Sequence, residues 1–125
     1  MPHKILIVDD DVLMLEALHD LFAASGYEVT TVSEGQAALD ILRKEHFDLI
    51  ILDVVMPRMT GYDVCVELRR RHDPGREIKV IMLTAKAESR GPKVEECGSD
   101  LYLNKPIDPA RLLELVESLL NPSTE

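Results

Sequence analysis

The sequence predicts an α/β domain with a five-stranded parallel sheet and helices on both faces. Three observations lead to this fold class. Short apolar runs rich in Val, Ile and Leu alternate with stretches whose apolar side chains have helical spacing. Such runs are too short for helices and suit strands that are buried on both faces. Regular alternation of strand and helix favours a parallel sheet joined by right-handed crossovers. Polar residues follow the apolar runs at the strand ends where open parallel sheets bind ligands.

The first half of the chain is expected to alternate strand and helix up to a third strand. Apolar side chains at helical spacing mark a helix over residues 12–24, which Gly26 can end. Ser33 and Gln36 have the spacing of a capping box, which indicates the start of the next helix. The expected ranges are 5–8 (strand), 12–24 (helix), 27–32 (strand), 33–44 (helix) and 48–53 (strand).

The second half continues the alternation. A turn signal at 72–75 separates a helix from the fourth strand, and Asp108 and Pro109 suit the N-cap and first position of the last helix. Residues 1–121 are therefore expected to form one domain, and residues 122–125 a polar tail that is a free terminus or the start of a linker. The expected ranges are 61–71 (helix), 78–83 (strand), a strand beginning at 101, and 109–120 (helix).

The segment at 86–98, between the fourth and fifth strands, departs from this pattern. Gly91 and Pro92 do not suit a helix interior, where Pro costs about 3 kcal/mol and Gly about 1 kcal/mol relative to Ala. A helix could begin with Pro92 and end at Gly98, but so short a helix is marginal by itself. We therefore expect the fourth helix to be short or irregular.

Composition and charge argue against several classes of protein. A chain of 125 residues with 46% hydrophobic residues suits one domain with a largely aliphatic core. The net charge of −9 argues against a nucleic-acid-binding surface. No apolar stretch is long enough to span a bilayer and no signal peptide is visible, so we expect a cytoplasmic protein with no membrane partner. Cys65 and Cys97 are expected to be reduced thiols.

Five polar residues follow the ends of the predicted strands. Asp9 and Asp10 come after the first strand, Asp53 ends the third, Thr84 follows the fourth and Lys105 follows the fifth. The carboxyl ends of parallel strands share one edge, so these side chains are expected to converge there. Crowded carboxylates repel one another and imply a divalent cation, for which Mg²⁺ is the natural choice. The hydroxyl and the ammonium suit an anion such as a phosphoryl group.

An alternative for the acidic residues is that they favour the first turn of a helix, and we assign that simpler role to Asp11.

The whole pattern resembles the receiver domain of two-component response regulators, from about residue 4 to residue 120. That resemblance implies a flavodoxin-like strand order, 2-1-3-4-5. It rests on several short motifs in the right order. They are Asp9-Asp10, Asp53, Met56-Pro57, Gly61, Thr84-Ala85, Tyr102 and Lys105-Pro106.

The resemblance also implies a role for the acidic residues. Asp53 would be the phosphoacceptor, a nucleophile that receives a phosphoryl group from a histidine kinase or a histidine phosphotransfer protein. Asp9, Asp10, Asp53 and the backbone carbonyl of Val55 would bind Mg²⁺. The domain would then be a phosphoacceptor that catalyses only its own phosphoryl transfer and dephosphorylation.

The remaining motifs would bind the phosphoryl group and pass on the signal. Thr84 and Lys105 would each contact a phosphoryl oxygen, and the peptide bond from Lys105 to Pro106 would be cis. Tyr102 would be the switch residue, alternating between two rotamers that are coupled to the Thr84 hydroxyl. The changed surface would alter binding to a downstream protein or effector domain, and the domain itself would be a monomer or a weak dimer.

Three other functions fit these residues less well. A phosphohydrolase of the haloacid dehalogenase type needs a second Asp two residues after its nucleophile, where this chain has Val55. A flavodoxin-like cofactor carrier needs a phosphate-cradling loop after the first strand, where this chain has acidic residues. A degenerate receiver that only binds partners would lack some of the five site residues, and all five are present.

Overall fold

A computed structural model describes residues 2–70, 78–84 and 99–121. It contains a five-stranded sheet of order β2-β1-β3-β4-β5 in which every neighbouring pair is parallel. The predicted fold class and strand order are confirmed. The elements are β1 (Lys4–Val8), α1 (Val12–Ala24), β2 (Glu28–Val32), α2 (Gly35–Lys44), β3 (Leu49–Asp53), α3 (Gly61–Arg70), β4 (Lys79–Thr84), β5 (Leu101–Asn104) and α5 (Pro109–Leu120).

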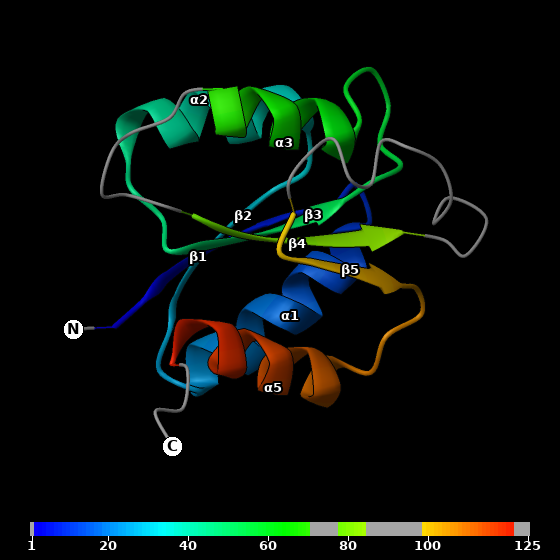
Figure 1. Ribbon diagram of the computed structural model, residues 1–125. Coiled ribbons are helices and arrows are strands. Elements are labelled where there is room, and N and C mark those ends of the chain that lie inside the picture. The colour runs from blue at the N-terminus through cyan, green and yellow to red at the C-terminus, as the bar shows by residue number, and fades with distance from the viewer. Residues whose placement is uncertain (1, 71–77, 85–98, 122–125) are drawn as a thin grey trace.

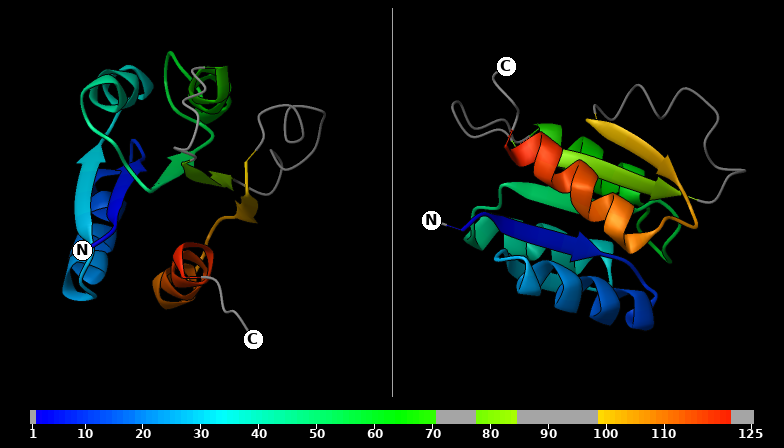
Figure 2. Two further views of the ribbon diagram at one scale, coloured as in Figure 1. Left: turned by 60° about the vertical axis from the view of Figure 1, so that its left-hand side comes forward. Right: turned by 90° about the horizontal axis from the view of Figure 1, so that it is seen from below.

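The helices lie in two layers, one on each face of the sheet. Helices α2 and α3 cover one face, and α1 and α5 cover the other (Figure 1). Helices α1 and α5 contact each other, and the view from below shows both on the near side of the sheet (Figure 2). None of the helices in the described ranges is long and apolar enough to cross a membrane. The expected fourth helix at 86–98, the turn at 72–75, the tail at 122–125 and Cys97 lie outside the described residues.

Two apolar layers form because successive side chains of a strand point to opposite faces. Central strand β3 shows this most clearly, since all its residues are buried. Ile50 and Leu52 pack with the buried face of α2 and α3, whereas Leu49 and Ile51 pack with that of α1 and α5. A strand covered on both faces cannot shift its register without exposing apolar side chains, so the position of its last residue, Asp53, is firmly determined.

The helix starts agree with the sequence at two places and differ at a third. Asp11 caps α1 by accepting hydrogen bonds from the backbone N–H groups of Leu13 and Met14, and Asp108 caps α5. The expected capping box of Ser33 and Gln36 is wrong. Helix α2 begins at Gly35, two residues after the start of the expected range, and its N-cap Glu34 makes no side-chain cap. Gln36 instead donates to Asp40 at 3.0 Å.

A reciprocal capping arrangement does occur at α3. The Thr60 hydroxyl accepts from the backbone N–H of Asp63 at 3.2 Å, and the Asp63 carboxylate accepts from the backbone N–H of Thr60 at 3.0 Å. The motif was not predicted because Asp stands where a capping box usually has Glu or Gln. It determines where α3 begins, directly after the loop that follows Asp53.

Edge strand β5 is held at its beginning by Asp100. The carboxylate of Asp100 accepts from the backbone N–H of Val80 at 2.8 Å and from the Arg69 guanidinium at 3.2 Å. Arg69 also donates to the backbone carbonyl of Ile78 at 2.9 Å. These bonds hold α3, β4 and β5 together at the amino ends of the strands, away from the predicted site. They also set the register of β5, which leads to Lys105.

The start of α3 lies against the end of β3 at Gly61. The backbone N–H of Gly61 donates to the carbonyl of Val54 at 2.9 Å. A β-carbon at this position would lie 2.4 Å from the carbonyl oxygen of Asp53. Only glycine therefore allows α3 to begin so close to the backbone of the predicted phosphoacceptor.

We predict that Gly61→Ala lowers the free energy of unfolding by about 2 kcal/mol, as overpacking against rigid atoms typically does. The matched control is Gly35→Ala, because Gly35 is also the first residue of a helix. The three atoms nearest its β-carbon would be side-chain atoms of Met59 and Val64 at 3.0 Å, a looser contact than the backbone atoms that face Gly61. We expect that variant to lose less than about 1 kcal/mol, since alanine favours the helix. Urea unfolding measures both, and equal losses would contradict the argument.

Candidate functional site

Three carboxylates come together at the carboxyl edge of the sheet. Strands β1 and β3 are parallel neighbours with Val8 opposite Leu52, so Asp9 and Asp53 follow at the same level. One carboxylate oxygen from each of Asp9, Asp10 and Asp53 lies within 4.8 Å of the others. Asp9 is 1% exposed and Asp53 4%, whereas Asp10 is exposed to solvent. The parallel topology therefore brings the three acidic residues together, as the sequence predicted.

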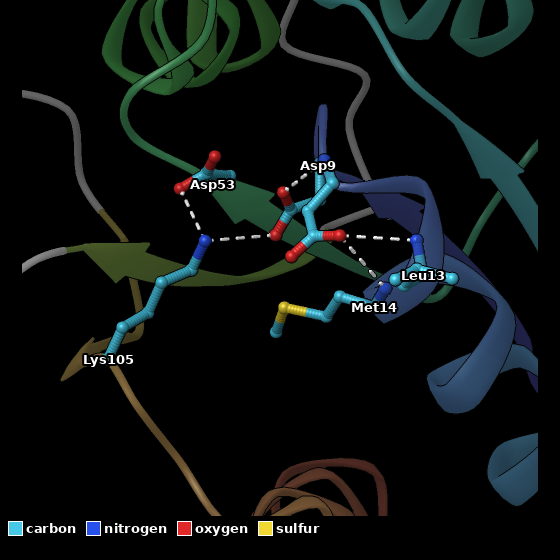
Figure 3. A network of polar contacts seen from close by, with 6 residues as sticks. Asp9, Leu13, Met14, Asp53 and Lys105 are labelled. Atoms are coloured by element: carbon cyan, nitrogen blue, oxygen red, sulfur yellow. Dashed lines mark hydrogen bonds and ion pairs between the residues drawn. The ribbon is translucent and has the colours of Figure 1, made fainter.

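Lys105 links two of these carboxylates. Its Nζ lies 3.1 Å from Oδ2 of Asp9 and 3.1 Å from Oδ1 of Asp53 (Figure 3). Lys105 reaches the site because it follows β5, and its backbone N–H donates to the carbonyl of Thr84 at 2.6 Å. The peptide bond from Lys105 to Pro106 is cis, as the family resemblance implied. The ammonium is thus held between the two buried acids.

Asp9 has a further contact that the sequence did not reveal. Its Oδ1 accepts from the backbone N–H of Asp11 at 2.9 Å, while its Oδ2 accepts from Lys105. Asp11 in turn caps α1. The Asp9 carboxylate therefore connects the start of α1 to the ammonium group of Lys105. The three acidic residues after β1 differ in role: Asp9 pairs with Lys105, Asp10 borders the cluster at the surface, and Asp11 caps α1.

Val55 lies close to the acidic cluster along the chain, and Thr84 is brought near it by the pairing of β3 with β4. Thr84 ends β4 and is fully buried, and the residue before it, Leu83, pairs with Asp53 in the sheet. Val55 follows Asp53 by two residues and is 53% exposed, although its neighbours Val54 and Met56 are buried. The five predicted polar residues therefore share one edge, with Asp53 and Asp9 at its buried centre.

The electrostatics of the site reflect burial and mutual repulsion. Burial raises the pKa of the Asp53 carboxyl and the Asp9 carboxylate raises it further. The hydrogen bond from Lys105 lowers it, and the net result is a pKa of about 6 instead of 3.8. Burial lowers the pKa of Lys105, but its hydrogen bonds to Asp53 and Asp9 outweigh burial, so that pKa is raised overall.

One ammonium group does not balance three carboxylates. The remaining negative charge and the close-set oxygen atoms suit a small, hard divalent cation, which prefers oxygen ligands. Asp9, Asp10 and Asp53 are therefore the side chains that fit Mg²⁺.

Tyr102 has a partner that was not predicted. Its hydroxyl is in hydrogen-bonding contact with the hydroxyl of Tyr62, and the two rings are stacked with centroids 6.4 Å apart. Tyr62 belongs to the first turn of α3 and Tyr102 to β5. No local signal in the sequence could indicate this pair, because the residues are 40 positions apart and meet only through the sheet order.

The raised pKa of Asp53 predicts how stability depends on pH without divalent metal. The folded protein holds this proton to about pH 6 and the unfolded chain only to about 3.8. The proton therefore stabilises the folded state below pH 4, and this contribution is lost as the pH rises through 6. We expect wild type to lose about 2 kcal/mol relative to Asp53→Asn over this range, allowing for screening at the rim of the site. Urea unfolding of both proteins from pH 4 to pH 7 measures this difference, and parallel pH profiles would contradict it.

Comparison with known proteins agrees with this geometry. Residues 5–117 match the family described as "Response regulator receiver domain". The chain is 42% identical over 118 residues to the probable transcriptional regulator ycf27 of Cyanophora paradoxa, covering 94% of this chain and 48% of that protein. The chain thus spans about half the length of the curated relatives it matches.

Solved structures show the same similarity. A putative response regulator from Chloroflexus aurantiacus superposes with a TM-score of 0.84 at 35% identity, covering 96% of this chain and 98% of that one. The response regulator TrrA from Thermotoga maritima, in complex with Mg²⁺-BeF, gives a TM-score of 0.81 at 32% identity, covering 95% and 99%. With the family match, these likenesses show that this chain belongs to the response regulator receiver domain family.

Proposed function

We propose that this receiver domain is a phosphoacceptor of a two-component phosphorelay, with Asp53 as the residue that is phosphorylated. The observation that carries the proposal is the ammonium of Lys105 held between Asp53 and Asp9 at a buried edge that Asp10 also borders. A histidine kinase or a histidine phosphotransfer protein is the donor. Outside its own phosphoryl transfer and dephosphorylation, the domain is not an enzyme.

The proposed reaction transfers one phosphoryl group. A carboxylate oxygen of Asp53 attacks the phosphorus of the donor's phosphohistidine and forms an O–P bond. The N–P bond breaks, and the histidine nitrogen keeps the electron pair. The product is an acyl phosphate on Asp53, which water later hydrolyses to carboxylate and inorganic phosphate. Because little covalent assistance is needed, catalysis is mainly alignment and neutralisation of charge.

The residues around Asp53 supply that alignment and neutralisation. Lys105 already lies 3.1 Å from Oδ1 of Asp53, so its ammonium is in place to bind a phosphoryl oxygen attached there. The buried Thr84, at the end of the neighbouring strand, is proposed to donate its hydroxyl to another phosphoryl oxygen. Asp9 keeps Lys105 in position through the second ion pair.

Mg²⁺ is the proposed cofactor. Asp9, Asp10 and Asp53 would hold it together with the backbone carbonyl of Val55, and when bound it neutralises negative charge at the site. The TrrA structure, a neighbour in fold and sequence, is described as a complex with Mg²⁺-BeF, which supports this choice.

The proposed output is a change in binding to a downstream protein or to an effector domain. Some curated relatives are named as probable transcriptional regulators and are about twice as long as this chain, so an effector domain is the first candidate. A cytoplasmic location and a monomeric or weakly dimeric state accompany this proposal. Tyr102, on the edge strand β5, is the proposed switch residue.

Phosphorylation is tested most directly by mass. Incubating the protein with acetyl phosphate and Mg²⁺ is expected to add the mass of one phosphoryl group, and Asp53→Asn is expected to abolish it. Asp40→Asn is the control, because Asp40 is an exposed carboxylate on α2. That variant should be labelled like wild type. Labelling of Asp53→Asn at the wild-type rate would show that another residue accepts the phosphoryl group.

Metal binding is tested by stability. A ligand that binds only the folded protein raises the free energy of unfolding, by about 2.7 kcal/mol when its concentration is a hundred times Kd. We expect Mg²⁺ to stabilise wild type in this way and Asp10→Ala to lose most of the effect, because a carboxylate ligand is missing. Asp20→Ala, at an exposed position on α1, should keep the full effect. An unchanged Mg²⁺ effect in Asp10→Ala would place the ion elsewhere.

A further inference from the structure

The first turn of α3 is firmly connected to the backbone of Asp53. A β-carbon on Gly61 would lie 2.4 Å from the carbonyl oxygen of Asp53, so the two backbones approach closely, and the N–H of Gly61 donates to the carbonyl of Val54. The reciprocal bonds between Thr60 and Asp63 determine where the helix starts. A displacement of the backbone at Asp53 must therefore move the first turn of α3, because packed atoms in van der Waals contact cannot absorb it. Tyr62 is the residue of that turn that follows Gly61.

Tyr62 carries this connection across the sheet. Its side chain is buried, and its ring stacks on the ring of Tyr102 at an interplanar angle of 23°. The hydroxyls of the two residues are also in hydrogen-bonding contact. The stacking fixes the distance between α3 and β5, and the hydrogen bond fixes the orientation of Tyr102, since a tyrosine hydroxyl lies at the far end of its ring.

Tyr102 is connected to the other side of the site as well. It lies opposite Met82 in the sheet, and two residues later Asn104 lies opposite Thr84. The next residue is Lys105, whose backbone N–H donates to the carbonyl of Thr84 and whose ammonium pairs with Asp53. The Tyr62–Tyr102 pair is therefore connected to Asp53 on both sides: Tyr62 through its neighbour Gly61, and Tyr102 through Lys105, which follows β5.

We propose that Tyr62 is a positioning residue whose hydroxyl holds Tyr102 against α3 while Asp53 is unphosphorylated. This inference rests on the proposed function. In the arrangement described here, Asp53 is paired with Lys105 as a carboxylate, and the two tyrosine hydroxyls are in contact. A contact that is made in only one of two arrangements favours that arrangement by its own net free energy. The Tyr62 hydroxyl therefore opposes the phosphorylated arrangement.

The test removes single hydroxyls and measures binding of a phosphoryl mimic. The probe is beryllofluoride in saturating Mg²⁺, with Kd measured by isothermal titration calorimetry. Tyr62→Phe keeps the ring and its stacking but loses the hydrogen bond. It is expected to bind beryllofluoride about two- to tenfold more tightly than wild type, the range that corresponds to one net hydrogen bond. In a Tyr102→Phe background, where the bond is already absent, the same substitution should leave the affinity unchanged.

The control is Tyr27→Phe. The Tyr27 ring is tilted against the rings of His3 and Phe22, on the face of the sheet opposite Tyr62 and Tyr102, and removing its hydroxyl should not change the affinity. A purely structural role for Tyr62 predicts lower stability in urea with equal or weaker binding of the probe. Tighter binding by a protein of equal or lower stability is the result that only a positioning role produces.

The remaining outcomes separate this inference from the proposed function. Equal or weaker binding by Tyr62→Phe overturns the inference, and so does tightening that persists in the Tyr102→Phe background. If wild type does not bind beryllofluoride, or if Asp53→Asn binds it equally well, the proposed function fails and the inference fails with it.

Discussion

The ammonium group of Lys105, placed between the carboxylates of Asp9 and Asp53, is the interaction on which the rest of the site depends. Both acids are buried, and removing the ammonium would leave two buried carboxylates uncompensated, which destabilises a fold far more than the intact group stabilises it. The ammonium arrives from the fifth strand and the acids from the first and third. The correct order of the strands is therefore a condition for the site to exist.

Parallel topology makes this meeting possible. Residues that end neighbouring strands lie at the same level, so Val8 opposite Leu52 brings Asp9 next to Asp53, and Thr84 opposite Asn104 brings Lys105 to the same edge. The opposite edge of the sheet has a purely structural task. There Asp100 and Arg69 fasten β5 to β4 and α3, which keeps that register in place. Stability and chemistry are thus separated between the two ends of the strands.

The acidic cluster is a local source of instability. Burial and the neighbouring Asp9 raise the pKa of Asp53, which means that its charged form is held at a cost in folding free energy. Ligands that neutralise this charge lower that cost, and their binding is thereby coupled to the arrangement of the surrounding residues. A rearrangement around Asp53 would first reach α3 at Gly61 and Tyr62. It would reach the edge strand β5 at Tyr102.

The sequence by itself determined the strands, most of the helices and the identity of the five polar site residues. Continuous apolar runs can only be buried strands, and the polar residues that follow them must lie at the carboxyl edge. Local capping was predicted correctly at Asp108, where a side chain contacts backbone two residues away. Asp11 was expected only to favour the first turn of a helix, and it is instead the N-cap of α1. It was wrong at Ser33, where α2 begins after Glu34 without a side-chain cap.

Only the tertiary structure decided the long-range pairs. The attachment of β5 to β4 by Asp100 and the contact of Tyr62 with Tyr102 depend on how side chains from separate elements are oriented once the sheet has formed. Spacing along the chain carries information about neighbours within a helix or strand. It does not reveal which two rings will stack across elements 40 residues apart, because that is settled by the register and packing of the whole domain.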